Sequence, residues 1–369
     1  MQDFQENPSL KDTLSLPCPS CGSELHWSAK SQKIACDHCG YTEEIDHSKG
    51  KVVEKSLAEA ASKVSNFVPE DGGKKVFECQ NCGAKFMVES DKVGINCGFC
   101  GSENINLEAF QHQFIQPLGI VPFNVSKESS EEHFNTWIRQ GWFHPNKLKQ
   151  LAAIENLHGI YLPFWTYDAQ SESDWSGEAG HYYYETRRVQ INGKWQNQQV
   201  QKVRWVHRSG HLNHFFDDVL VVASGGLQQR EVERILPYRL EEIVNFDPRL
   251  VAGWESEIYN LEVDKGYQVA NQIMDAKIRQ MCSAQLGGDT QRNLRIRSQK
   301  FNQTFKHIIL PAWICSYVFK GKTYRFTING QTGKVHGEKP LSWKKIVFLV
   351  LLFALFIFAI YLLRQSGVA

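Results

Sequence analysis

Eight of the ten cysteines fall into two blocks that share one internal spacing. The first block holds Cys18, Cys21, Cys36 and Cys39, and the second holds Cys79, Cys82, Cys97 and Cys100. In each block, fourteen residues separate two Cys-x-x-Cys-Gly pairs, and every cysteine of the second block lies 61 positions after its counterpart. Two such pairs place four thiolates at the corners of one tetrahedron, the geometry of a structural zinc site. We therefore predict an internal duplication that binds two Zn²⁺ ions.

Three other interpretations of these cysteines are weaker. Four thiolates can also hold iron. A disulfide framework requires an oxidising compartment, and catalytic redox pairs usually occur singly. His26 and His38 lie inside the first block, but the second block has no histidine at the equivalent positions, so we do not assign them as ligands.

The far end of the chain predicts a membrane anchor. Ile346 to Leu363 form an uncharged apolar run of eighteen residues, about 27 Å long as a helix and sufficient to cross a hydrocarbon core. Four lysines (Lys334, Lys339, Lys344 and Lys345) precede the run, whereas only Arg364 follows it. The positive-inside rule then places the N-terminal domains in the cytoplasm, on a single-pass protein of the inner (cytoplasmic) membrane. The acidic start has no apolar stretch typical of a signal peptide, so we expect a tail-anchored protein.

Charge argues against binding of nucleic acid by the cysteine blocks. Residues 1–110 contain eleven lysines, no arginine and seventeen acidic residues, which gives 11 − 17 = −6. A nucleic-acid-binding module needs a basic surface, and arginine is its preferred contact residue. Basic residues gather instead in the middle of the chain, among them Arg187, Arg188, Lys194, Lys202 and Arg204. A solvated strand face explains them, and a patch for anionic lipid or an acidic partner is the alternative.

The sequence lacks the patterns typical of an enzyme. The stretch around Lys320 misses the first glycine of a P-loop and alternates like a β-hairpin. Zinc-protease, nucleophile-elbow and EF-hand motifs are missing. Asp217 and Asp218 are adjacent, so on a regular strand they would point to opposite faces. We therefore predict no catalytic residues and no enzymatic activity.

The pattern of elements predicts an α+β fold. We expect zinc ribbon 1 at 1–45, a linker at 46–75, zinc ribbon 2 at 76–104, an α+β middle domain at 105–340 and the anchor at 341–369. The middle domain should be rich in strands, with helices near 126–141 and 261–286 and a hairpin that turns at Asn192–Gly193. Leu-Pro-x-Trp occurs in both Ile160–Trp165 and Ile308–Trp313. This repeat suggests a second duplication, of two related β-units whose tryptophans would fill a shared interior.

The assembled segments resemble a bacterial family of tail-anchored zinc-ribbon proteins. The resemblance is carried by the cysteine blocks, by "GIYLPFWTYDA", "LVAGWESEIY" and "TINGQTGKVHGEKP", and by the terminal apolar run. Members are often named after a primosomal replication helicase or a transcription-factor zinc ribbon, but this chain has no helicase motifs. Some relatives are encoded beside phage-shock-type membrane-coat proteins or flotillin-like proteins. The resemblance thus implies a role in membrane stress or membrane organisation, and it transfers only the eight cysteines as metal ligands.

We therefore expect a non-enzymatic, membrane-anchored adaptor or scaffold. Its zinc ribbons would present a docking surface to a cytosolic protein, such as a membrane-coat or flotillin-like protein. The alternative is a membrane-tethered nucleic-acid-binding protein related to replication, with a primosomal-type ribbon but no motor. An enzyme in the middle domain is the third interpretation.

Overall fold

A computed structural model of the chain describes residues 16–45, 52–60, 74–89, 105–108, 115–142, 144–145, 157–191, 194–319 and 322–365, together with Cys97, Phe99 and Ser102. The fold mixes α and β structure and is rich in strands, as the sequence predicts.

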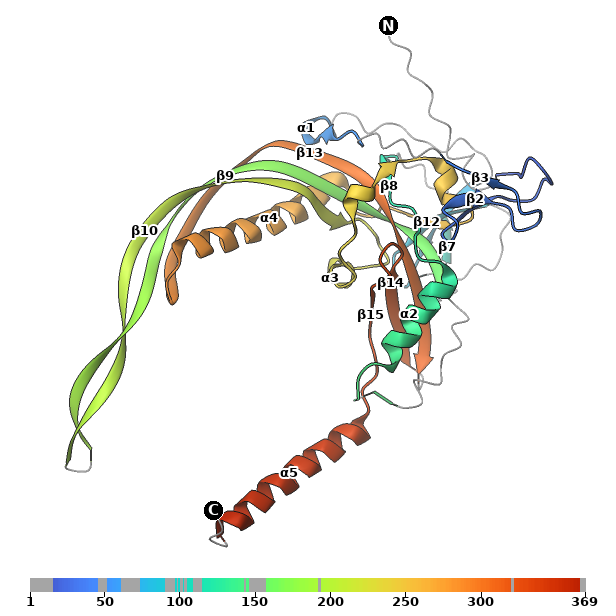
Figure 1. Cartoon of the computed structure of the whole chain (residues 1–369). Coiled ribbons are helices and arrows are strands. Elements are labelled where there is room, and N and C mark those ends of the chain that lie inside the picture. The colour runs from blue at the N-terminus through green and yellow to red at the C-terminus, as the bar shows by residue number, and fades with distance from the viewer. Residues whose placement is uncertain are drawn as a thin grey trace.

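Three very long strands form a curved sheet that dominates the molecule (Figure 1). They are β9 (Leu157–Ile191), β10 (Lys194–Val222) and β13 (Thr290–Phe319). The central strand, β9, pairs antiparallel with β10 on one side and with β13 on the other. Strands of 29 to 35 residues far exceed the usual length of about 5–6. The hairpin prediction is confirmed in register, because Ile191 pairs with Lys194.

The helix α4 (Val263–Leu286) lies beneath the arch formed by these strands (Figure 1). Ala270, Met274, Ile278 and Cys282 recur at helical spacing and are buried in one core cluster with aromatic residues of β9. At the start of the helix, Tyr167 Oη donates to Val263 O at 2.6 Å. The predicted helix near 261–286 is confirmed, and its apolar stripe packs into the core.

Shorter elements complete the body at the other end of the arch. Five helical segments cap it: α1 (Leu57–Ala60), α2 (Lys127–Arg139), α3 (Gln229–Glu233), η3 (Leu240–Glu242) and η4 (Pro248–Val251). Six strands extend the sheet: β4 (Lys55–Ser56), β8 (Gly119–Ile120), β11 (Val244–Asn245), β12 (Glu255–Ile258), β14 (Lys322–Asn329) and β15 (Val335–Gly337). In α2 the Ser126 side chain accepts from Ser129 N, which confirms the predicted helix and its capping residue. The hairpin predicted around Lys320 is present, since Phe319 pairs with Lys322.

The two cysteine blocks each form a small sheet. The first contains β1 (His26–Ser28), β2 (Lys33–Ala35) and β3 (Thr42–Glu43). The second contains β5 (Lys74–Cys79), β6 (Lys85–Glu89) and β7 (Ile105–Glu108), and it continues the large sheet through β12.

The two Leu-Pro-x-Trp segments lie side by side. Leu162 of β9 pairs with Leu310 of β13, and Ile160–Trp165 runs antiparallel to Ile308–Trp313 around that pair. Their tryptophans do not share one interior, contrary to our expectation. Trp165 belongs to the core beneath the arch, whereas Trp313 belongs to the core beside the first cysteine block. The two segments are antiparallel about the Leu162–Leu310 pair. Equivalent positions such as the two tryptophans therefore lie at opposite ends of the paired region.

The C-terminal helix α5 (Trp343–Gln365) projects away from the body (Figure 1). Its segment Trp343–Leu362 has a mean hydropathy of 2.8, and none of its most apolar window is buried. By its length and composition, this helix could cross a membrane. Its exposure distinguishes it from a core helix, which would be mostly buried.

Candidate metal centres

The four cysteines of the first block converge on one point. Their Sγ atoms all lie within 4.8 Å of one another, with Cys18–Cys39 at 3.5 Å and Cys21–Cys36 at 3.6 Å. A disulfide requires about 2.05 Å, whereas a tetrahedral ion with bonds of about 2.3 Å separates its sulfurs by about 3.8 Å. The donor set therefore fits one tetrahedral metal ion.

The backbone around each pair turns in the same way. Gly22 N donates to Cys18 O at 2.8 Å, and Cys18 N donates to Ser23 O at 2.6 Å. The same two bonds recur at Cys36 and at Cys79, and the glycines that close these turns have φ between 73° and 78°. A positive φ favours glycine, which explains the glycine after each Cys-x-x-Cys pair. These turns aim the two sulfurs of each pair towards the same point.

The second block repeats the arrangement in its described part. Cys79, Cys82 and Cys97 also lie within 4.8 Å of one another, and Cys82 Sγ is 3.6 Å from Cys97 Sγ. Cys97 N donates to Ser102 O at 2.9 Å, as in the other turns. The fourth predicted ligand, Cys100, lies outside the described residues. Two cysteine-rich groups can thus hold a metal ion.

Without an ion, the thiols of the first block ionise unequally. Hydrogen bonds from the Ser23 side chain and main chain lower the pKa of Cys21 to about 6, with smaller contributions from Cys39 and Cys36. A main-chain hydrogen bond at Tyr41 acts to lower the pKa of Cys39, but Cys21, burial and the remaining thiols outweigh it and raise the pKa to about 11. Several thiolates in one small volume repel one another, and a divalent cation removes that repulsion.

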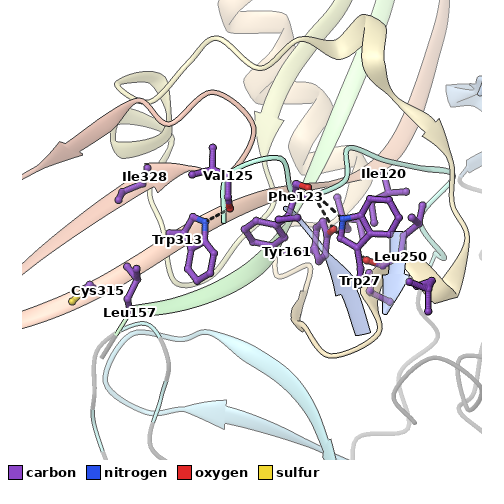
Figure 2. Packing of buried hydrophobic residues seen from close by; sticks show 14 of the residues in the cluster. Trp27, Ile120, Phe123, Val125, Leu157, Tyr161, Leu250, Trp313, Cys315 and Ile328 are labelled. Carbon is purple, nitrogen blue, oxygen red and sulfur yellow. Dashed lines mark hydrogen bonds between the residues drawn. The ribbon is translucent and has the colours of Figure 1, made fainter. Parts of the chain in front are cut away.

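The first block is built into the core of the body rather than held apart from it. Trp27 on β1 is fully buried, and its Nε1 donates to Phe123 O at 3.3 Å. In the other direction, Trp254 Nε1 donates to Trp27 O at 3.0 Å. Figure 2 shows the Trp27 indole in the same cluster as Phe123, Tyr161 and Leu250. The metal centre and the body therefore share one hydrophobic core.

The second block joins the body through its backbone and its cysteines. On β6, Phe86 pairs with Glu257 of β12, and Asn260 Nδ2 donates to Gly83 O at 3.1 Å. Cys79, Cys97 and Phe99 belong to the same core cluster as residues of β9 and β13.

Glu257 is a buried acid at this junction. It is 3 % exposed, and its Oε1 accepts from Gly225 N at 2.9 Å and from Gly226 N at 3.1 Å. Burial raises its pKa to about 7, hydrogen bonds from the loop of Ser224 to Gly226 act against that rise, and the charge of nearby Cys97 adds to it. Glu257 thus ties the loop at Gly225 and Gly226 to strand β12, which pairs with the second block.

A second set of buried titratable side chains lies on the arch, at positions that no sequence motif predicted. Asp168 of β9 is 2 % exposed and accepts from Asp218 N at 2.6 Å and from Thr304 Oγ1 at 3.2 Å. Lys306 Nζ lies 2.6 Å from Asp218 Oδ1 and 3.4 Å from Glu54 Oε1. We call these five residues the Asp168 cluster.

Burial and neighbouring carboxylates govern the protonation of this cluster. Burial raises the pKa of Asp168 to about 7, and a hydrogen bond with Glu54 adds to the shift, while Asp218 N and Lys306 oppose it. For Glu54, hydrogen bonds with Asp168 and Thr304 outweigh burial and lower the pKa. Of the two carboxyl groups, Asp168 therefore keeps its proton to the higher pH.

Two irregularities of the sheet bring the Asp168 cluster together. The register of β10 shifts between Phe216 and Val219, and that of β13 shifts between Phe301 and Thr304. Asp218 and Asn302 adopt positive φ of 51° and 53° in these bulges. Alternation on a regular strand sent Asp217 and Asp218 to opposite faces in the prediction, and a bulge changes that alternation. Spacing alone therefore could not identify the cluster.

The base of α5 is attached to the end of α2. Lys339 Nζ donates to the carbonyls of Trp137 and Gln140. Beyond α2, His144 Nδ1 is 3.0 Å from Pro340 O, and Lys345 Nζ donates to His144 O at 2.9 Å. The apolar helix thus leaves from a fixed point on the body.

Comparison with known proteins gives one relative of matching length. The chain is 26% identical over 342 residues to a protein of Bacillus subtilis (strain 168) described as "Uncharacterized protein YdjG", and the match covers 90% of this chain and 92% of that protein. No family model and no solved structure matches the chain. The match therefore extends over most of the length of both chains.

Proposed function

We propose that this protein is a non-enzymatic membrane scaffold that binds two Zn²⁺ ions and presents a rigid docking surface to a cytosolic protein. The observation that carries the proposal is the shared core of the first metal centre and the body. Trp27 is buried among body residues and makes hydrogen bonds in both directions. A module fixed in this way holds one orientation relative to the point where α5 leaves.

Zinc suits these centres better than other metals. Four thiolates with sulfurs 3.5–3.6 Å apart match a closed structural zinc site, which leaves no open position for a substrate. When bound, zinc supplies cross-linking of the two turns and no reaction. Apart from its metal, the first block has a short three-stranded sheet, so the ion contributes much of its folding free energy.

The anchor sets where the docking surface acts. We infer that α5 spans the cytoplasmic membrane once, with the body in the cytoplasm, because the lysines lie before the helix. Trp142 and Trp343 are 52% and 75% exposed near its base, and tryptophan is enriched at membrane interfaces. The attachment of Lys339 and His144 to the helix base keeps the body close to the bilayer surface.

A protein partner fits the metal centres better than nucleic acid. Residues 1–110 have a net charge of −6 and no arginine, so they repel phosphate. Exposed acids occur on the first centre, where the Asp37 side chain is 91% exposed. Following the family resemblance, we propose a membrane-coat or flotillin-like protein as the partner class.

One groove on the arch has polar and charged side chains of the kinds that enzymes use. A groove of about 480 Å³ lies between α4 and β13, lined by residues that include Asn271, Asp275 and Lys300. Lys300 forms an ion pair with Asp275 there. Each of these two charges therefore has a structural partner, and an ion pair of this kind stabilises the contact between helix and strand.

The test uses the full chain in lipid nanodiscs, with either DNA or a purified phage-shock-type membrane-coat protein added across a salt series. We expect the coat protein to bind and DNA to bind weakly at every salt concentration. The variant Asp37→Lys should weaken coat binding, whereas Asp217→Lys, an exposed acid on β10, should not. Tight DNA binding with a steep salt dependence would overturn the scaffold in favour of the nucleic-acid alternative.

A further inference from the structure

Beyond α4 and β13, the arch continues as a free two-stranded arm. Pairing of β13 with β9 ends at Gly180, where Thr290 begins β13. From there, residues 181–191 of β9 and 194–204 of β10 pair only with each other among the described residues. Figure 1 shows these two strand segments reaching past the end of α4 and away from the body. We call residues 181–191 and 194–204 the arm.

The base of the arm is held firmly, so its direction is defined. Tyr182 N donates to Asp289 Oδ2 at 2.8 Å, and Arg208 Nη1 donates to Leu286 O at 2.9 Å. Eleven residues per strand at about 3.3 Å each give a reach of about 36 Å. The tip can therefore contact a surface that the body does not touch.

The arm exposes large aromatic side chains to solvent. Tyr182, Tyr184 and Trp195 are 45%, 63% and 63% exposed. In the antiparallel register, Tyr182 pairs with Val203, Tyr184 with Gln201 and Trp195 with Gln190. Positions two apart along a strand share a face, so these three rings all lie on one face of the ribbon. Tyrosine and tryptophan are the residues enriched where a membrane meets water.

The same arm is strongly basic in an otherwise balanced chain. It carries Arg187, Arg188, Lys194, Lys202 and Arg204 against one acid, Glu185, which gives 5 − 1 = +4. The whole chain has a net charge of only +1. Arg187, Arg188, Lys194 and Arg204 are exposed. In the same register, Arg188 lies on the face of the three rings, and the other three cations lie on the opposite face of the thin ribbon. Cations of this kind each gain about 1 kcal/mol near an anionic leaflet.

We propose that the arm is a second membrane contact, which lies on the anionic lipid headgroups of the leaflet that α5 enters. The inference rests on the proposed anchoring, and it adds a lipid class and a site. In the view of Figure 1, the arm and α5 both extend away from β2 and β3 of the first metal centre. A second copy fits the free edges less well, because two arms of charge +4 would repel. Cations on an edge strand also discourage strand-to-strand association.

The arm and the anchor together constrain the body from two sides. A single helix allows the body to rotate about the membrane normal and to tilt. A second contact about 36 Å from the arm's base restricts tilt, so the metal centres face the cytosol at a fixed angle.

The test places a photoreactive benzoylphenylalanine at Trp195 of the full chain in nanodiscs. Phe215, 54% exposed on β10 outside the arm, is the matched control position. We expect a lipid adduct at position 195 and not at 215 in phosphatidylglycerol-rich discs. The adduct should fall several-fold in phosphatidylcholine discs or at high salt. The variant Arg188→Gln, on the face of the three rings, should also reduce the adduct at position 195, by about fivefold for the loss of one charge in contact with lipid.

Three results would overturn the inference: equal adducts at both positions, an adduct to a second copy, or an adduct to nucleic acid in cells. Carbonate extraction of the unmodified chain separates the two proposals. Retention in the membrane without an adduct at 195 contradicts the arm but keeps the anchor. If the chain is extracted, the anchor fails, and adduct formation with added anionic vesicles still decides the arm.

Discussion

Replacing Trp27 by alanine tests whether the first metal centre and the body are one folding unit. The Trp27 residue is fully buried, with a relative exposure of 0%. It belongs to one core cluster with body residues that include Phe123 and Leu250. If the centre were an independent zinc-folded module, loss of this side chain would affect only that module. If the core is shared, the substitution destabilises the whole body.

The magnitude follows from the contacts that are lost and those that remain. Truncation of a buried tryptophan costs about 3–5 kcal/mol. Phe123 O keeps a hydrogen bond from Gln32 Nε2 at 2.8 Å, so no unpaired acceptor adds to that cost. The main-chain bonds of Trp27 with Ala252 and Trp254 survive the substitution. At about 2–4 °C per kcal/mol for domains of 150–250 residues, the melting temperature should fall by roughly 6–20 °C, towards the lower figure in this longer chain.

The assay is thermal unfolding of the full chain in detergent, followed by near-ultraviolet circular dichroism and by release of metal to a chromogenic chelator. Trp195→Ala is the matched control, because that indole is 63% exposed on the arm, and its melting temperature should equal that of the parent. Unfolding and metal release should move together in Trp27→Ala. A melting temperature within about 1 °C of the parent, or early metal release with an unchanged body transition, would refute the shared core.

Three further predictions concern metal, protons and topology. Elemental analysis should find two zinc ions per full chain and one in Cys36→Ser, with two retained in Cys282→Ala, whose thiol lies on α4. Folded Asp168 has a pKa of about 7 against about 3.9 unfolded, so its contribution to stability is complete below about pH 4 and disappears as pH rises through about 7. Asp168→Asn should therefore have a higher unfolding free energy than the parent, and the difference should grow between about pH 5 and pH 8 to on the order of 2–4 kcal/mol. Asp217→Asn should show the same pH dependence as the parent. The same pH dependence of the unfolding free energy in all three proteins would refute the assignment. A protease-cleavable tag should be cut from outside the cell only at the C-terminus, and cutting at the N-terminal tag would reverse the topology.

Local patterns predicted much of the structure because local physics determines those parts. Cysteine spacing identified the four thiols that converge in the first block, since a Cys-x-x-Cys-Gly turn brings two sulfurs together by local geometry. Capping at Ser126 and the apolar stripe of α4 located two helices. Eighteen apolar residues identified the exposed C-terminal helix.

Features that depend on distant pairing could not be predicted in this way. The sequence predicted the hairpin at Asn192–Gly193 but not the length of its strands, and pairing on both sides keeps β9 continuous over 35 residues. The bulges at Asp218 and Asn302 assemble the Asp168 cluster from three strands and the segment before β4. Burial of Trp27 against Phe123 joins residues 96 positions apart. Each of these depends on contacts that no short window of sequence contains.

Photocrosslinking from the first metal centre in living cells would identify the molecule that the docking surface binds. Benzoylphenylalanine at Asp37, whose side chain is 91% exposed, would sample whatever the docking surface contacts. The scaffold account predicts an adduct to a membrane-coat or flotillin-like protein, identified by mass spectrometry, which disappears when Cys36→Ser removes a metal ligand. An adduct to DNA or RNA that persists in the presence of the coat protein would contradict it.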